Sequence, residues 1–224
     1  MNNIEQVEQT IAFVKETLQG AEGGHDWFHI QRVFNNSLLI AKDEKVDIQI
    51  VSLSALLHDI ADSKFHGGNE SVGPQMAREF LASLGIKPSV IDHVVKIIEN
   101  ISFKSSLDSK GEKKVAKRFN SLELQVVQDA DRLDALGAIG IARAFNYGGF
   151  KGRELYNPDI APNLKMDKET YKNSKAPTIN HFYEKLLLLK NKMNTAGGRK
   201  LALERHQFML DYLQQFYNEW NGSV

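Results

Sequence analysis

Apolar residues recur at helical spacing along most of the chain. In the first segment Val7, Ile11, Val14 and Leu18 follow one another every three or four residues, and Gly20 comes soon after them. This spacing places side chains on one face of an α-helix, whereas a strand would alternate at every second residue. We find no clear alternating run of β-branched residues, so the pattern predicts an all-α protein.

The residues at the ends of these segments predict where several helices begin and end. Asp26 and Asp47 each precede an apolar segment and are placed to cap a helix, because a short carboxylate accepts the free N–H groups of the first turn. Gly85 follows the segment that begins near Val72 and is typical of a helix end. Pro88 is placed to open the next helix, since proline is favoured in the first turn.

The second half of the chain combines a long apolar pattern with an interrupted stretch. Residues 122–145 form the longest helical pattern and predict one long helix. The preceding residues 104–118, rich in Lys and Arg, predict a mobile loop or a frayed helix start, and the Gly and Pro residues of 146–177 predict a long irregular excursion. Two amphipathic helices, roughly 179–193 and 199–220, are expected to finish the chain.

These elements predict a single domain over residues 1–224. We expect its core to lie within about residues 20–145, with residues 146–224 packed on that core as a C-terminal extension. A chain of 224 residues with 42% hydrophobic side chains is long enough to bury a substantial core.

Composition excludes several kinds of chemistry and partner. Lys+Arg and Asp+Glu both total 28, so no surplus of positive charge favours nucleic acid or an anionic membrane. The chain has no cysteine, which excludes disulfides, thiolate metal ligands and a Cys nucleophile, and any metal site must use His, Asp or Glu. No leader-like start and no apolar run of about 18 residues occurs, so we expect a cytoplasmic protein.

The doublet His58-Asp59 closes the apolar segment 48–57 and makes a metal site the first hypothesis. Neighbouring residues on a helix point about 100° apart, so both side chains can bind one ion only if the helix ends or loosens there. Asp62 follows His58 by four residues and could face the same site. A second doublet, His25-Asp26, lies before the expected cap, and we leave His25 outside the site.

Further candidates lie upstream and downstream. His29 and Arg32 are three residues apart and share a helix face. Asp129 and Asp131 differ by about 200° and cannot face one ion together. If the helix runs to Phe145, Asp131 has the more apolar stripe, and a carboxylate on a buried face must be paired or bind a metal. Asp131 is therefore the favoured ligand, with pairing to Arg32 or another cation as the alternative.

Asp134 lies on the same predicted stripe as Asp131. We expect it to hold a ligand histidine or a basic residue in place.

Three segments in this order resemble the HD-domain metal-dependent phosphohydrolase superfamily. They read His25-Asp-Trp-Phe-His29-Ile-Gln-Arg32-Val33, Leu56-Leu-His58-Asp59-Ile60 and Asp129-Ala-Asp131-Arg-Leu-Asp-Ala135. Later segments extend the resemblance over nearly the whole chain, namely 137–143, 146–153, 180–185 and 204–208. They are similar to one bacterial subfamily of small single-domain enzymes, whose better understood members act on nucleotides.

The resemblance implies an all-helical fold with a set of four metal ligands: His29, His58, Asp59 and Asp131. It also implies that Asp62 positions the attacking water, and Arg32 and Lys64 are our candidates for holding phosphate. Some relatives have a further histidine where this chain has Ile101, which cannot bind a metal. We therefore expect one divalent ion, with Mn, Fe, Co, Ni, Zn and Mg all compatible with the ligand set.

These features predict a metal-dependent phosphohydrolase that acts on a nucleotide and releases pyrophosphate or phosphate through a metal-activated water. A phosphodiesterase is the enzymatic alternative, and a regulatory module that binds metal or nucleotide without turnover is the other. The expected partner is a small phosphorylated molecule, with neither nucleic acid nor a membrane, and the sequence gives no indication of the oligomeric state.

Overall fold

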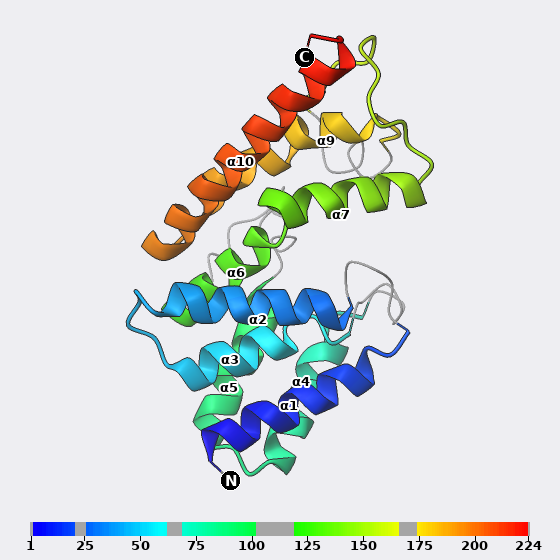
Figure 1. Cartoon of the computed structure of the whole chain (residues 1–224). Helices are drawn as coiled ribbons and strands as arrows, with labels where there is room; N and C mark the ends of the chain where they lie inside the picture. Colours follow the sequence, from blue (N-terminus) through cyan, green and yellow to red (C-terminus); the bar gives the residue numbers. More distant parts are fainter. Residues whose placement is uncertain (1, 21–25, 62–68, 102–118, 166–173, 224) are drawn as a thin grey trace, which may run out of the picture. The chain divides into compact units, whose positions relative to one another are not determined.

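The structure is a computed structural model that describes residues 2–20, 26–61, 69–101, 119–165 and 174–223. All of the regular elements in these ranges are helices (Figure 1), which confirms the all-α prediction. None of these helices is long and apolar enough to cross a membrane. The chain divides into two compact units, Met1–Asp131 and Arg132–Val224, and the single-domain organisation stays a prediction.

The first unit is built around a central buried helix. Its elements are α1 (Asn3–Thr17), α2 (Trp27–Ala41), α3 (Ile48–Leu57), α4 (Val72–Ser83), α5 (Pro88–Ile101) and most of α6 (Leu122–Leu133). Helix α3 packs against α1, α2 and α5 (Figure 1), and every residue from Ile50 to Leu57 is buried. A helix that is apolar on all sides needs neighbours on all sides. The end of α3, where His58 follows, is therefore held firmly.

Local signals in the sequence predicted the ends of these helices correctly. The Asp26 carboxylate accepts a hydrogen bond of 2.9 Å from the His29 N–H at the start of α2. Asp47 accepts from the N–H groups of Gln49 and Ile50 at the start of α3. Helix α5 begins at Pro88, as predicted. These caps satisfy N–H groups that have no partner within the helix.

The long helix predicted over residues 122–145 is wrong, because the segment forms two helices. Helix α6 ends at Leu133, and α7 begins at Gly137 and continues to Phe150. Gly137 has φ +70°, a left-handed conformation that favours glycine and interrupts the helix. The apolar pattern runs on through the break because both helices bury apolar residues, so periodicity alone did not reveal it.

The second unit contains α7 (Gly137–Phe150), α9 (Thr178–Glu184), the 3₁₀-helix η3 (Leu186–Lys192) and α10 (Ala196–Trp220). Helix α10 packs against α7 and η3. The single helix predicted over 179–193 is wrong, since the backbone leaves helical geometry at Lys185, with φ −143° and ψ −57°. The predicted last helix is confirmed by α10. The irregular excursion predicted over 146–177 is wrong for 146–150, because α7 continues through them, and it is borne out over 151–165 and 174–177. Residues 166–173 and 104–118 lie outside the described residues.

His181 on α9 is expected to make the stability of the protein depend on pH. Burial, together with the nearby positive charges of Lys185 and Arg153, lowers its pKa from 6.5 to about 4. Because the folded protein disfavours the proton that the unfolded chain accepts, the free energy of unfolding should fall as the pH drops from 6.5 to 4, by about 3 kcal/mol. Urea unfolding at a series of pH values measures this decline.

In His181→Asn the same decline should be smaller by about that amount, whatever the substitution does to stability at neutral pH. Equal pH slopes for the two proteins would contradict the role of His181.

Candidate metal site

Two histidines of the first unit meet at the ends of their helices. His29 lies in the first turn of α2, where the Asp26 cap holds its backbone, and it is 3% exposed. His58 follows directly on the end of α3, which stops at Leu57, and it is 9% exposed. The two ring centroids are 5.4 Å apart at an angle of 64°. Residues 29 apart in the sequence thus present buried imidazoles to one place.

Asp131, in the last turn of α6, joins these histidines. Its Oδ1 lies 3.6 Å from Nε2 of His29, and one ligand atom from each of His29, His58 and Asp131 lies within 4.8 Å of the others. Two ligand atoms at about 2.1 Å from one ion are at most about 4.2 Å apart. The three groups are therefore close enough to bind a single ion after small side-chain movements.

The hydrogen bond of the His58 ring favours the tautomer that suits a metal ligand binding through Nε2. Its Nδ1 lies 2.9 Å from the backbone oxygen of Ala55, and a carbonyl oxygen only accepts hydrogen bonds. Nδ1 of His58 therefore donates its proton to this oxygen, and in the tautomer protonated at Nδ1 the lone pair lies on Nε2. Metal-binding histidines are commonly oriented by such a hydrogen bond from the other ring nitrogen.

The donor set suits a divalent metal ion. Neutral imidazole nitrogens and a carboxylate oxygen are ligands for Zn, Fe, Co, Ni and Mn. The types of residue present thus fit the divalent metal ion that the sequence predicted, and they suit each of these metals.

The other predicted site residues are distributed around this group. Asp59 lies half-buried in the turn after α3 and, in the described part of the chain, does not belong to the cluster formed by His29, His58 and Asp131. Arg32 is half-buried on α2, one turn beyond His29. Asp62 and Lys64 lie outside the described residues.

The burial argument for Asp131 was wrong, although Asp131 does lie beside His29. The Asp131 side chain is 43% exposed, whereas Asp129 is fully buried. Because α6 ends at Leu133, its buried stripe runs through Val126, Asp129 and Ala130, and the residues beyond Leu133 do not extend the stripe assumed for Asp131. A correct stripe would have required knowledge of the helix end.

Asp134 follows the end of α6 and is 1% exposed. Its carboxylate forms an ion pair with the guanidinium of Arg143, which confirms the expectation that Asp134 holds a basic residue. A carboxylate buried to this extent is stable as an ion only with such a partner.

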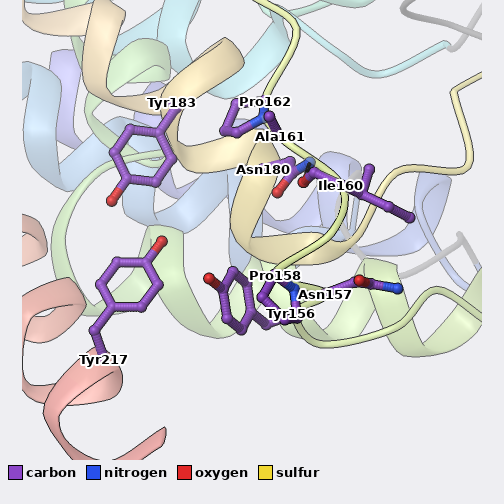
Figure 2. A pocket seen from close by; sticks show the side chains of 9 residues that line it. All are labelled: Tyr156, Asn157, Pro158, Ile160, Ala161, Pro162, Asn180, Tyr183 and Tyr217. Carbon is purple, nitrogen blue, oxygen red and sulfur yellow. Dashed lines mark hydrogen bonds between the residues drawn. The ribbon is translucent and has the colours of Figure 1, made fainter. Parts of the chain in front are cut away.

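The second unit contains a pocket that sequence reasoning did not find. Figure 2 shows Tyr156, Tyr183 and Tyr217 around it, with the hydroxyl groups of Tyr183 and Tyr217 pointing toward each other. The pocket has a volume of about 340 Å³, and no charged side chain of the described residues lines it. Burial and the hydrogen bond with Tyr183 raise the pKa of Tyr217, so its phenol stays neutral. Such a lining offers no His, Asp or Glu ligand to a metal ion and no cation to a phosphate.

The site and the helical fold define a class of protein, namely an all-α protein with a His/Asp metal-binding cluster. The family model for the HD domain matches residues 27–136, the range that contains His29, His58 and Asp131. The uncharacterized protein YpgQ of Bacillus subtilis is 37% identical over 224 residues, which cover 99% of this chain and 97% of YpgQ.

Solved structures agree with this assignment. An HD-superfamily hydrolase from Bacillus thuringiensis shares 40% identity with a TM-score of 0.78, over 98% of this chain and 99% of that one. The crystal structure of Bacillus subtilis YpgQ in complex with ADP shares 36% identity with a TM-score of 0.73, over 98% and 97%. The chain belongs to the HD superfamily, and its solved relatives include hydrolases of that superfamily.

Proposed function

We propose that the protein is a metal-dependent phosphohydrolase that acts on nucleotides and releases pyrophosphate or phosphate. The observation that carries the proposal is the cluster of His29, His58 and Asp131, which unites three separate helices at one possible ion site. Support for a nucleotide as substrate comes from YpgQ, a similar protein whose crystal structure contains ADP.

The proposed ligands are His29, His58, Asp59 and Asp131. Asp59 is included because it adjoins His58 in the turn that follows the end of α3. Two imidazoles and two carboxylates neutralise a divalent charge and leave positions for water and a phosphate oxygen. The bound ion would lower the pKa of a water and polarise the phosphoryl group.

The remaining roles are proposed for charged residues that lie close to these ligands in the sequence. Asp62 is proposed to orient the attacking water and accept its proton, since it follows the His58-Asp59 doublet by one helical turn's length of chain. Arg32, one turn beyond His29 on α2, is proposed to hold a phosphate through its guanidinium, with Lys64 as a second cation.

The test is a panel of nucleoside mono-, di- and triphosphates assayed with Mn²⁺, Co²⁺, Ni²⁺, Zn²⁺ or Mg²⁺, with the products identified. Pyrophosphate from a triphosphate would establish cleavage between the α and β phosphates, and phosphate would establish the phosphatase reaction. Binding of nucleotides without turnover under every metal would contradict the proposal and favour a regulatory module. Hydrolysis of a diester alone would favour a phosphodiesterase.

Asp62→Ala should retain the metal and lose turnover. We expect kcat to fall by roughly 100-fold or more, because positioned proton transfer contributes about 10²–10⁴ in rate. Steady-state kinetics beside metal analysis of the same preparation measures both quantities. Asp62→Asn is the matched variant, since it keeps the shape but cannot accept the proton, and it should be as slow. Wild-type kcat in both variants would remove Asp62 from the mechanism.

A further inference from the structure

The end of α6 is held by arginines from two segments that the proposed reaction does not use. Nη1 of Arg205, on α10, donates a hydrogen bond of 2.6 Å to the backbone oxygen of Leu133, the last residue of α6. Nη1 of Arg143, on α7, donates to the backbone oxygen of Asp134 at 3.2 Å and pairs with the Asp134 carboxylate. Arg205, 72 positions further along the chain, thus bonds the carbonyl group that ends α6.

These contacts supply what a helix end lacks. The last carbonyl groups of an α-helix have no N–H partner within it, and the helix end carries partial negative charge. A cationic donor that is itself partly buried satisfies both needs. Burial lowers the pKa of Arg205, whereas the charges of Asp134 and Glu204 act in the opposite direction. An arginine side chain stays protonated in proteins, so Arg205 keeps its charge there.

Gly137 makes room for this arrangement. It has φ +70°, and a Cβ at that position would meet Cγ of Arg205 at 3.1 Å and Cβ of Arg205 at 3.2 Å. The Arg205 side chain therefore occupies the space that any larger residue at 137 would need. Its aliphatic part packs on the glycine while its guanidinium bonds Leu133.

Asp131 lies two residues before Leu133 in the same helix. Fraying of the last turn of α6 would release the backbone of Asp131, whose carboxylate is 43% exposed and has Oδ1 3.6 Å from Nε2 of His29. Because the Asp131 side chain is partly exposed, its position beside His29 depends on the backbone that carries it. A fixed end of α6 would hold that backbone in place.

We infer that Arg205 is a positioning residue, which fixes the last turn of α6 and so sets Asp131 for metal binding. The inference rests on the proposed function, because it takes Asp131 as a ligand. Residues that orient a metal ligand change metal affinity by roughly 10–100-fold when they are removed. Arg205 acts through the backbone of α6 and does not itself touch the ion.

The experiment measures the Mn²⁺ dissociation constant of the full chain by competition with a fluorescent chelator, at a temperature where circular dichroism shows each variant to be folded. Arg205→Met should weaken Mn²⁺ binding about tenfold. Arg205→Lys, which keeps a cation near the helix end, should recover part of that loss. Gly137→Ala, which displaces the Arg205 side chain without removing it, should weaken binding in the same direction.

Arg199→Met is the matched control. Arg199 is also on α10 and donates to the backbone oxygen of Asn194 at 2.8 Å. Unlike the hydrogen bond of Arg205, this one does not involve α6. Its Mn²⁺ affinity should stay within about twofold of the wild type, even if its melting temperature falls as far as that of Arg205→Met.

Equal Mn²⁺ affinities for the wild type, Arg205→Met and Gly137→Ala would overturn the positioning role while leaving the metal site intact. Equal losses in Arg199→Met and Arg205→Met would reduce the effect to general destabilisation and overturn it as well. Absence of Mn²⁺ binding by the wild type would instead contradict the proposed function itself.

Discussion

His58→Ala is expected to weaken Mn²⁺ binding by more than about a hundredfold and to abolish measurable nucleotide hydrolysis. The substitution removes an imidazole whose Nδ1–H is committed to the Ala55 carbonyl and whose Nε2 is available to an ion. Loss of a residue that only orients a ligand lowers metal affinity by roughly 10–100-fold, so loss of the ligand should exceed that range. Chelator competition measures the affinity, and the nucleotide panel measures the activity.

His93→Ala is the control for this substitution. His93 lies on α5 in the same unit, and its Nε2 is 2.9 Å from the Ser121 hydroxyl and 3.4 Å from a carboxylate oxygen of Glu123. It therefore resembles His58 as a partly buried histidine near an acidic residue, but it is not in the metal cluster. Mn²⁺ affinity should survive His93→Ala. Wild-type affinity in His58→Ala would refute the site.

Asp59→Ala decides whether the ligand set has three or four protein members. As a fourth ligand, Asp59 would be needed for tight Mn²⁺ binding and activity, and its removal should lower both. An unchanged Mn²⁺ content in the Asp59→Ala protein would restrict the set to His29, His58 and Asp131, the cluster observed within 4.8 Å.

Gly140→Ala is expected to destabilise the protein by about 3 kcal/mol. Gly140 lies in the first turn of α7, just after the break that follows α6, and a Cβ there would overlap the backbone carbonyl of Ala135. Because the obstacle is backbone, no side-chain rotation relieves the overlap, and the chain between α6 and α7 must shift. A melting curve should show a decrease of roughly 6–12 °C.

Gly149→Ala provides the comparison within the same helix. A Cβ at Gly149 has no atom within 4 Å, so the substitution adds helix propensity without overlap and should raise stability by about 0.5–1 kcal/mol. If Gly140→Ala lowers stability and Gly149→Ala raises it, the close approach of the Ala135 carbonyl, and not helix propensity, is the reason for glycine at position 140. A melting temperature for Gly140→Ala at or above that of the wild type would contradict the packing described for this turn.

The parts of the fold that the sequence predicted correctly depend on neighbouring residues. Asp26 and Asp47 cap the helices that follow them because each carboxylate accepts a hydrogen bond from an N–H group only two or three residues away. The apolar segment 48–57 and the His58-Asp59 doublet after it predicted the end of α3. His58 of this doublet belongs to the cluster with His29 and Asp131.

The predictions that were wrong depended on contacts distant in the sequence. Residues 122–145 have one apolar pattern but form two helices, because Gly137 adopts positive φ where the Arg205 side chain packs on it. The same break moved the buried stripe of α6 onto Asp129 and left Asp131 half-exposed. The pocket lined by Tyr183 and Tyr217 brings together residues of α9 and α10. The sequence pattern of neither helix alone predicts it.

The sequence by itself determined the helical class, most helix ends and the residue types available for a metal site, since periodicity, capping and composition are properties of short segments or of the whole chain. Only the tertiary structure decided which of those residues meet. His29, His58 and Asp131 approach one another because α2, α3 and α6 each place one side chain at the same point, and that convergence depends on the packing of helices whose positions no local pattern encodes.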